Sequence, residues 1–346
     1  MKKRIIFIVF CILLCAFSTS CSKEKEKTLF SAYSFDSFDT VATIKGYAYT
    51  KEEFDAIADE AFALLREYHT LYTIYERYEG KTNLKSINDA RDGAHQTLTV
   101  DARIIDMLTL AREMYELTNG ECNIAMGSVL SIWHDHRTEA SDNPMQASLP
   151  SMEKLQNASL HTDINNMIID EEAGTVFLSD PKMTLDVGGI AKGYAVEMVA
   201  RHLEEMGVDG YVINVGGNIR GVGTSKDWRV GIENPHDDEQ TPYLAYLSIQ
   251  NQSVVTSGSY QRYYVVDGKS YHHVIDRDTL MPSEHFSSVS IICQSSAMGD
   301  ALSTALFCME LEEGRALISS LDDVEAMWVT PDGEVYYSDG FSKYEN

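Results

Sequence analysis

Two glycines stand just ahead of a lysine in "LDVGGIAKGYAVE", residues 185–197. Glycine lets backbone N–H groups approach an anion closely, and a helix N-terminus adds partial positive charge. Behind Gly188 and Gly189, Lys192 could supply a full charge, and Asp186 could accept a hydrogen bond. The spacing fits neither a Walker loop nor a dinucleotide fingerprint. The stretch therefore predicts either an unusual phosphate site or a plain strand-to-helix turn with a surface lysine.

Three further segments carry residues suited to chemistry. "VINVGGNIRGVG" places Gly216 and Gly217 directly after a buried-looking strand, and "VVTSGSYQRY" contains a bend of small residues. "YHHVIDRDTLMP" contains His273 and Asp276, which are candidates for acid–base work. Adjacent histidines on a strand usually point one inward and one outward, so we interpret His272 as structural and His273 as functional.

A carboxylate and a hydroxyl share one helix face in "SSAMGDALSTALF". Asp300 and Thr304 are four residues apart, so a helix through both would align them. Such a pair of hard oxygens suits Mg²⁺ that completes its shell with waters, carbonyls and phosphates. The alternative is an acidic residue in a first helical turn and a threonine bonded to its own backbone.

The secondary-structure elements that would position these residues alternate between strand and helix in the first half of the chain, and the second half is rich in short strands. We expect a strand over 34–45 and a loop over about 135–151, which is polar and contains two prolines. Apolar spacing and caps predict helices over 52–68, 101–117, 190–206, 297–308 and 311–320. Asp267-Gly268 and Asp332-Gly333 predict hairpins. The fold class is therefore α+β, with a mainly antiparallel sheet and packed helices.

The N-terminus has the pattern of an export signal. Lys2, Lys3 and Arg4 precede a short apolar run, and small residues lead into Cys21. We expect residues 1–20 to be a lipoprotein signal peptide and Cys21 to be lipidated, although ordinary secretion with cleavage nearby is the alternative. Residues 21–33 would be a tether and residues 34–346 one domain. The protein would then be anchored to the membrane on the periplasmic or extracellular face of a bacterial envelope.

Charge and cysteine usage exclude some functions. The chain carries 28 basic and 53 acidic residues. Removal of residues 1–20 leaves 25 basic residues and a net charge of −28. Such a chain lacks the basic face that nucleic acids or anionic lipids would need, so we expect no nucleic-acid partner. Cys122, Cys293 and Cys308 have no metal-like spacing. We expect buried thiols, and a single disulfide is the alternative.

Taken together and in this order, the segments resemble the ApbE family of FAD-dependent FMN transferases. The resemblance covers roughly residues 34–340 and rests on five stretches, "LDVGGIAKGYAVE", "VINVGGNIRGVG", "VVTSGSYQRY", "HHVIDRDTLMP" and "DALSTALF". It implies a fold of T-fold type with FAD at its centre. Family members bind FAD with Mg²⁺, for which Mn²⁺ is an alternative, and pass FMN to a Thr or Ser hydroxyl of an exported flavoprotein, releasing AMP.

The resemblance also assigns roles to residues. Asp186 and Lys192 would contact FAD, and a carbonyl at Gly189 would join the side chains of Asp300 and Thr304 around the metal. His273, helped by Asp276, would activate the acceptor hydroxyl. The remaining cofactor-lining positions implied by the resemblance are Phe38 in "SFDT", Tyr75 in "LYTIYERY", Glu121, Cys122 and Asn123 in "GECNIA", and Ile275.

Some positions depart from the family pattern. Cys122 and Asn123 replace Phe-Asp, Asn218 replaces the Asp after the second glycine pair, and Arg277 and Leu280 replace Pro and Gly. Asn218 removes a charge near the expected metal. Two other functions therefore stay open beside the transferase. One is an FAD pyrophosphatase that yields FMN and AMP, and the other is a non-catalytic lipoprotein that binds flavin.

Overall fold

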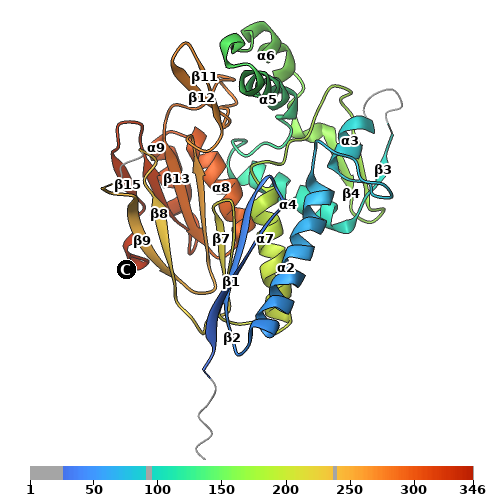
Figure 1. The fold of residues 1–346 in the computed structure, drawn as a ribbon. Coiled ribbons are helices and arrows are strands. Elements are labelled where there is room, and N and C mark those ends of the chain that lie inside the picture. The colour runs from blue at the N-terminus through green and yellow to red at the C-terminus, as the bar shows by residue number, and fades with distance from the viewer. Residues whose placement is uncertain (1–25, 91–95, 237–239, 346) are drawn as a thin grey trace, which may run out of the picture.

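An eight-stranded antiparallel sheet forms the centre of the fold in the computed structural model, which describes residues 26–90, 96–236 and 240–345 (Figure 1). Each neighbouring pair of its strands is antiparallel. The α+β class expected from the sequence is confirmed. In spatial order the strands are β1 (Thr28–Ser37), β2 (Thr40–Ala48), β6 (Tyr211–Val215), β7 (Asn218–Val222), β10 (Ser253–Gly258), β13 (Ser288–Cys293), β14 (Glu325–Val329) and β15 (Val335–Tyr337).

Long helices cover one face of this sheet. α2 (Lys51–Tyr72) packs on β1 and β2, α7 (Ala191–Glu205) packs on β7, and α8 (Ser296–Cys308) packs on β10 and β13. α4 (Ala102–Leu117) contributes to the same core and touches α8. The opposite face is covered by the ribbon of β8 (Trp228–Glu233) and β9 (Tyr243–Ile249), whose apolar side chains meet those of β10, β13 and β14. Because both faces of the sheet are covered here, every residue of β13 is buried, including Ser288 and Ser290.

Smaller elements close the upper end of the molecule in Figure 1. α5 (Gly127–Asp142) and α6 (Met152–Ser159) pack together, and the hairpin of β11 (Tyr263–Val266) and β12 (Lys269–His272) contacts α5. The remaining elements are α3 (Leu84–Ala90), α9 (Leu311–Ser319) and a three-stranded sheet of β3 (Leu98–Thr99), β5 (Thr175–Leu178) and β4 (Met167–Asp170).

Most of the expected helices and both hairpins are confirmed. The side chain of Asp101 caps α4 as expected, and α7 ends just before Gly207, whose φ is +77°. Hairpins form at Asp267-Gly268, between β11 and β12, and around Asp332-Gly333, between β14 and β15. Within the described residues no helix is long and apolar enough to cross a membrane. The expected signal peptide and Cys21 lie outside these residues.

Three expectations about boundaries are wrong. Residues 34–45 are not one strand, because the chain turns at Phe38 and Asp39 and pairs back on itself as β1 and β2. β1 begins at Thr28, so residues 28–33 are part of the sheet and not of a tether. The expected loop over 135–151 begins as helix, since α5 continues to Asp142 before Pro144.

Candidate active site

A cavity of about 570 Å³ lies where the central sheet and helices meet the upper elements. That volume falls within the range of sites for small molecules and cofactors. Its walls come from segments far apart in the sequence, including the β1–β2 turn, the end of α2, the start of α7 and α8. The cavity brings together nearly all the residues singled out from the sequence, namely Phe38, Tyr75, Glu121, Cys122, Asn123, Asp186, Gly189, Lys192, His273, Ile275, Asp300 and Thr304.

Asp276 is the described candidate that does not line this cavity. Its Oδ1 accepts hydrogen bonds from the backbone N–H groups of Asp278 and Thr279 and from the Thr279 hydroxyl. The carboxylate therefore shapes the turn after β12. The structure gives no geometric support to the expected role of Asp276 as a base, because its oxygen is engaged in this turn and not at the cavity.

α7 and α8 run antiparallel at the floor of the cavity in a close crossing. The backbone N–H of Gly193, in the first turn of α7, donates to Asp300 Oδ2 at 2.8 Å. A Cβ at position 193 would come within 2.3 Å of the Ser296 carbonyl oxygen and 2.4 Å of Asp300 Cβ. Only glycine permits this approach, so the glycine of "AKG" is required for helix packing.

The second glycine of the opening stretch meets the same helix one turn further on. A Cβ on Gly189 would lie 3.2 Å from Thr304 Oγ1, so Gly189 and Thr304 are neighbours. Thr304 Oγ1 is also 3.4 Å from Ser257 Oγ, in the small-residue bend at the end of β10. Lys192 Nζ lies 3.5 Å from Asp300 Oδ1. The strand-to-helix turn, the bend and α8 thus converge.

The donor set at this convergence fits a magnesium-type ion. The described part of the chain contains no cluster of three or more His, Cys, Asp or Glu side chains that could hold a metal. A metal here would therefore depend on the Asp300 carboxylate, the Thr304 hydroxyl and neutral oxygens. Asn218 contributes a buried amide whose Nδ2 lies 3.4 Å from Asp300 Oδ1 and whose Oδ1 has no partner. Mg²⁺ accepts such sites because it keeps waters and substrate phosphates in its shell.

His273 is held as a neutral imidazole at the cavity wall. Its Nδ1 lies 3.2 Å from the carbonyl oxygen of Arg262, and since a carbonyl only accepts, Nδ1 carries the proton. Nε2 is then the basic nitrogen. Burial, followed by the positive charges of Arg262 and Arg137, lowers the pKa of His273 to about 3. The imidazole is consequently unprotonated at neutral pH, as a general base must be.

Aromatic and acidic groups line other parts of the cavity. Tyr75 is about half exposed and stacks on His134 at 4.9 Å between ring centroids. Burial, with the nearby charge of Asp186, raises the pKa of Tyr75 to about 12. Burial also raises the pKa of Asp186, whose Oδ1 accepts a hydrogen bond from Gly188 N–H at 2.8 Å. Phe38 has a φ of +55°, and its N–H donates to His69 Nδ1.

Glu121 and Arg277 form an ion pair on the cavity wall. Arg277 Nε lies 2.8 Å from Glu121 Oε1. Burial raises the pKa of Glu121 to about 6, although Arg277 acts in the opposite direction. The neighbouring Cys122 is a buried thiol whose pKa burial raises to about 12, so it is neutral at physiological pH. Cys293 and Cys308 are also free and buried, which confirms the expectation of thiols.

Of the cations that line this cavity, sequence reasoning selected Lys192 as a site residue but not Arg137 or Arg262. Arg137 and Arg262 both line it, together with His134. Arg137 was missed because its segment, from about residue 135, was interpreted as a loop, whereas it lies in α5 next to His134. The buried Val129 and Trp133, four residues apart, were the helical signal that could have found it.

Comparison with known proteins agrees with this geometry. A protein of Klebsiella pneumoniae named FAD:protein FMN transferase is 31% identical over 289 residues, and the match covers 82% of this chain and 85% of that protein. A protein of the same name in Treponema pallidum is 30% identical, with 83% and 81% coverage. The crystal structure of the ApbE protein of Thermotoga maritima is 26% identical and superposes with a TM-score of 0.80 over 92% of this chain and 100% of that one.

A flavin transferase ApbE from Vibrio cholerae, 22% identical, shares the fold with a TM-score of 0.75 over 92% of this chain and 99% of its own. The ApbE family profile matches residues 38–328, which include all the described candidates of the cavity. With the central sheet, the α7–α8 crossing and this match in agreement, the chain belongs to the ApbE family.

Proposed function

We propose that this protein transfers FMN from FAD to a Thr or Ser hydroxyl of an exported flavoprotein, with release of AMP and with Mg²⁺ or Mn²⁺ as cofactor. Support comes from relatives named FAD:protein FMN transferase. The observation that carries the proposal is the contact of Gly189 with Thr304 and of Gly193 with Asp300, which gathers oxygen donors and Lys192 at the cavity floor.

The residues at this floor suit a pyrophosphate. Lys192 would neutralise charge on the phosphates, and Asp300, Thr304 and the Gly189 carbonyl would hold Mg²⁺. When bound, Mg²⁺ would supply charge neutralisation on the phosphate oxygens. Arg137 and Arg262 add two further cations to the cavity of an otherwise acidic protein. FAD is the substrate whose two phosphates and aromatic ring system match this floor and the aromatic wall at Tyr75.

His273 would take the proton of the acceptor hydroxyl at Nε2. In the protein without ligand, the surrounding cations contribute to its low pKa. An anionic pyrophosphate placed among Arg262, Arg137 and Lys192 would offset their charge and raise that pKa toward the range in which a base is efficient at neutral pH. The Arg262 carbonyl keeps Nδ1 protonated throughout and fixes the ring orientation.

One incubation separates the transferase from the two other functions. Protein lacking residues 1–21 is mixed with FAD, Mg²⁺ and a candidate acceptor domain, and AMP release and acceptor mass are measured. An acceptor that gains the mass of FMN supports the transferase. AMP with free FMN and no adduct supports a pyrophosphatase, and tight FAD binding without AMP supports a flavin-binding lipoprotein. Absence of FAD binding would refute all three.

We also propose that the protein is anchored to the envelope membrane through a lipid on Cys21. The support is the basic, apolar and small-residue order of residues 2–21. Cells fed a labelled fatty acid should yield labelled wild-type protein and unlabelled Cys21→Ala protein. Equal labelling, or none in either, would contradict the anchor.

A further inference from the structure

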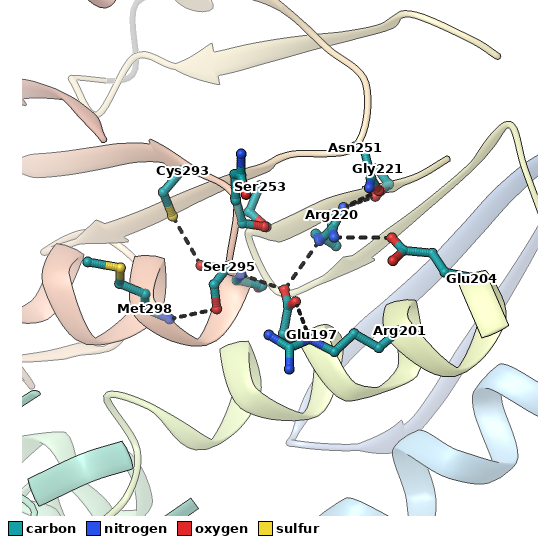
Figure 2. Close-up of polar contacts among 12 residues, drawn as sticks. Glu197, Arg201, Glu204, Arg220, Gly221, Asn251, Ser253, Cys293, Ser295 and Met298 are labelled. Carbon is teal, nitrogen blue, oxygen red and sulfur yellow. Dashed lines mark hydrogen bonds and ion pairs between the residues drawn. The ribbon is translucent and has the colours of Figure 1, made fainter. Parts of the chain in front are cut away.

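A buried ion pair lies beneath the cavity floor, on the side of α7 and α8 away from the ligand space. Glu197 of α7 and Arg220 of β7 are 3% and 4% exposed. Figure 2 shows Glu197 at the centre of a polar network that joins α7, β7 and the start of α8. None of the network's side chains lines the cavity.

Glu197 has three donors. Its Oε2 accepts from the backbone N–H of Ser296 at 2.9 Å. The same oxygen accepts from Arg220 Nε at 3.2 Å, as Figure 2 shows. Its Oε1 accepts from Arg201 Nε at 2.9 Å, and that arginine side chain is 58% exposed. Ser296 is the first residue of α8, so the Glu197 carboxylate satisfies an N–H group that has no partner within its own helix. The positive end of α8 also favours a negative charge there.

Each of the two helices carries a carboxylate that accepts a hydrogen bond from the first turn of the other. Asp300 of α8 accepts from the Gly193 N–H in the first turn of α7, and Glu197 of α7 accepts from the Ser296 N–H in the first turn of α8. Each helix therefore provides an acceptor for the other's N-terminus. A single contact would allow the helices to slide, whereas two opposed contacts fix their register.

This register extends to the expected metal ligands. Gly189, just before α7, meets Thr304, Gly193 meets Asp300, and Glu197 meets Ser296. From one contact to the next the position moves four residues forward toward the end of α7 and four residues back toward the start of α8. Ser296 and Thr304 are eight residues apart in α8, which places the Glu197 contact about 12 Å along that helix from the Gly189 contact. A shift of α8 along α7 at its N-terminus would move Asp300 and Thr304 relative to Gly189.

Arg220 holds the carboxylate in place from the sheet. Its Nη2 lies 3.1 Å from Glu204 Oε1, and its Nη1 donates to Asn251 Oδ1 at 2.8 Å. Replacement of a buried ion pair by apolar side chains often leaves stability unchanged or raised, so a buried pair is weak evidence for stability. A role in fixing geometry is the better account of this one, because its acceptor atom reaches the helix that carries Asp300.

We propose that the Glu197–Arg220 pair is a positioning element that holds α8 in register against α7 and so sets the arrangement of Gly189, Asp300 and Thr304 around the metal. This inference rests on the proposed function. Both residues act through α8 and touch neither substrate nor metal.

Two substitutions at one position separate geometry from charge. In Glu197→Gln the amide oxygen can take the place of Oε2 and keep the bonds from Ser296 and Arg220, while the amide nitrogen faces the exposed Arg201, which can move. In Glu197→Leu no acceptor remains. Arg201→Gln is the matched control, since it removes the solvent-side partner of the same carboxylate. Glu197→Leu combined with Arg220→Met removes both buried charges, and we expect it to fold even if the single leucine variant does not, because no unpaired buried charge is left.

The primary measurement is the affinity of each folded protein for Mn²⁺, obtained from the EPR signal of free Mn²⁺. The melting temperature in EDTA is measured as well, to report stability without metal. We expect Glu197→Leu and the double variant to lose about 10–100-fold in Mn²⁺ affinity, as other residues that orient metal ligands do. Glu197→Gln should recover most of that affinity, and Arg201→Gln should match wild type. FAD fluorescence quenching without metal should change little in any variant.

Each outcome decides between the inference and a purely structural role. Wild-type Mn²⁺ affinity in folded Glu197→Leu or in the double variant, with only a lower melting temperature, would overturn the positioning role. Equal losses in Glu197→Gln and Glu197→Leu would overturn the role of the Ser296 contact. If wild-type protein itself binds neither FAD nor Mn²⁺, the proposed function fails as well. If it binds both and the variants do too, only the positioning inference fails.

Discussion

The backbone N–H of Gly193 lies 2.8 Å from Asp300 Oδ2, and this bond ties the first turn of α7 to the helix that carries the expected metal ligands. The Gly193 N–H lies in the first turn of α7, where it has no acceptor within its own helix. Asp300, which provides the acceptor, is only 2% exposed. The same glycine has no Cβ to separate the two backbones. Helix packing and the oxygen donors of the cavity are therefore built from one contact.

Gly193→Ala should disturb both the packing of α7 on α8 and the oxygen donors of the cavity. The added methyl group would lie 2.3 Å from the Ser296 carbonyl oxygen, and backbone cannot move aside as a side chain can. We expect a loss of about 1–3 kcal/mol in the free energy of unfolding, measured by urea denaturation, together with weaker Mn²⁺ binding. Gly314→Ala in α9 is the control, since its methyl group would meet the end of the Leu306 side chain at 3.2 Å. A Gly193→Ala protein as stable as the control would contradict the close crossing.

Asp300→Asn tests the metal site directly. It removes the carboxylate from a donor set that otherwise consists of neutral oxygens, so Mn²⁺ affinity should fall and Mg²⁺-dependent AMP release should drop by about 100-fold or more. Asp55→Asn, which removes a surface carboxylate paired with Lys51, should leave both unchanged. Undiminished Mg²⁺-stimulated turnover in Asp300→Asn would remove this residue from the metal shell.

Much of the fold follows from local sequence, and the exceptions have physical causes. Asp101 and Gly207 mark helix ends by side-chain capping and positive φ, which are local signals. The β1–β2 turn has no such signal, because Phe38 and Asp39 adopt positive φ values of 55° and 52° without a glycine. A contact distant in sequence, from Phe38 N–H to His69 Nδ1, holds that turn. The strand order in the sheet likewise depends on packing between distant segments.

The residues of the candidate site likewise fall into those that local sequence identifies and those that only the tertiary structure places. Asp186, Lys192, Asp300 and Thr304 lie in stretches whose glycines and helical spacing mark them locally. Arg137 reaches the cavity through a helix whose outer side is polar enough to read as a loop, so only the tertiary structure places it. The Glu197–Ser296 contact, 99 residues apart in sequence, has no local signature at all.

The depressed pKa of His273 should be visible in stability measurements on the protein without FAD or metal. The unfolded chain takes up a proton near pH 6.5, whereas the folded protein does so only near pH 3, so stability is lost as the pH falls from about 6.5 toward 3. His273→Gln removes this loss. Relative to wild type, its free energy of unfolding should rise by about 2 kcal/mol between pH 7.5 and pH 5. Urea titrations at both pH values measure this change, and an identical difference at the two values would refute the buried neutral imidazole.

Asn218→Asp should lower the stability of the metal-free protein and raise its affinity for a divalent metal ion. Asn218 is 1% exposed and its amide lies 3.4 Å from Asp300 Oδ1, so an aspartate there would place two carboxylates in a buried site. Without metal, their repulsion should lower the melting temperature in EDTA. A divalent cation would relieve that repulsion, so Mn²⁺ affinity at pH 8 should rise and Mn²⁺ should raise the melting temperature more than it does in wild type. Asn214→Asp, whose parent side chain caps Gly217 N–H at 3.1 Å, serves as the nearby control. Unchanged Mn²⁺ affinity in Asn218→Asp would place the metal away from Asn218, because a second carboxylate beside a bound cation cannot leave its affinity unaltered.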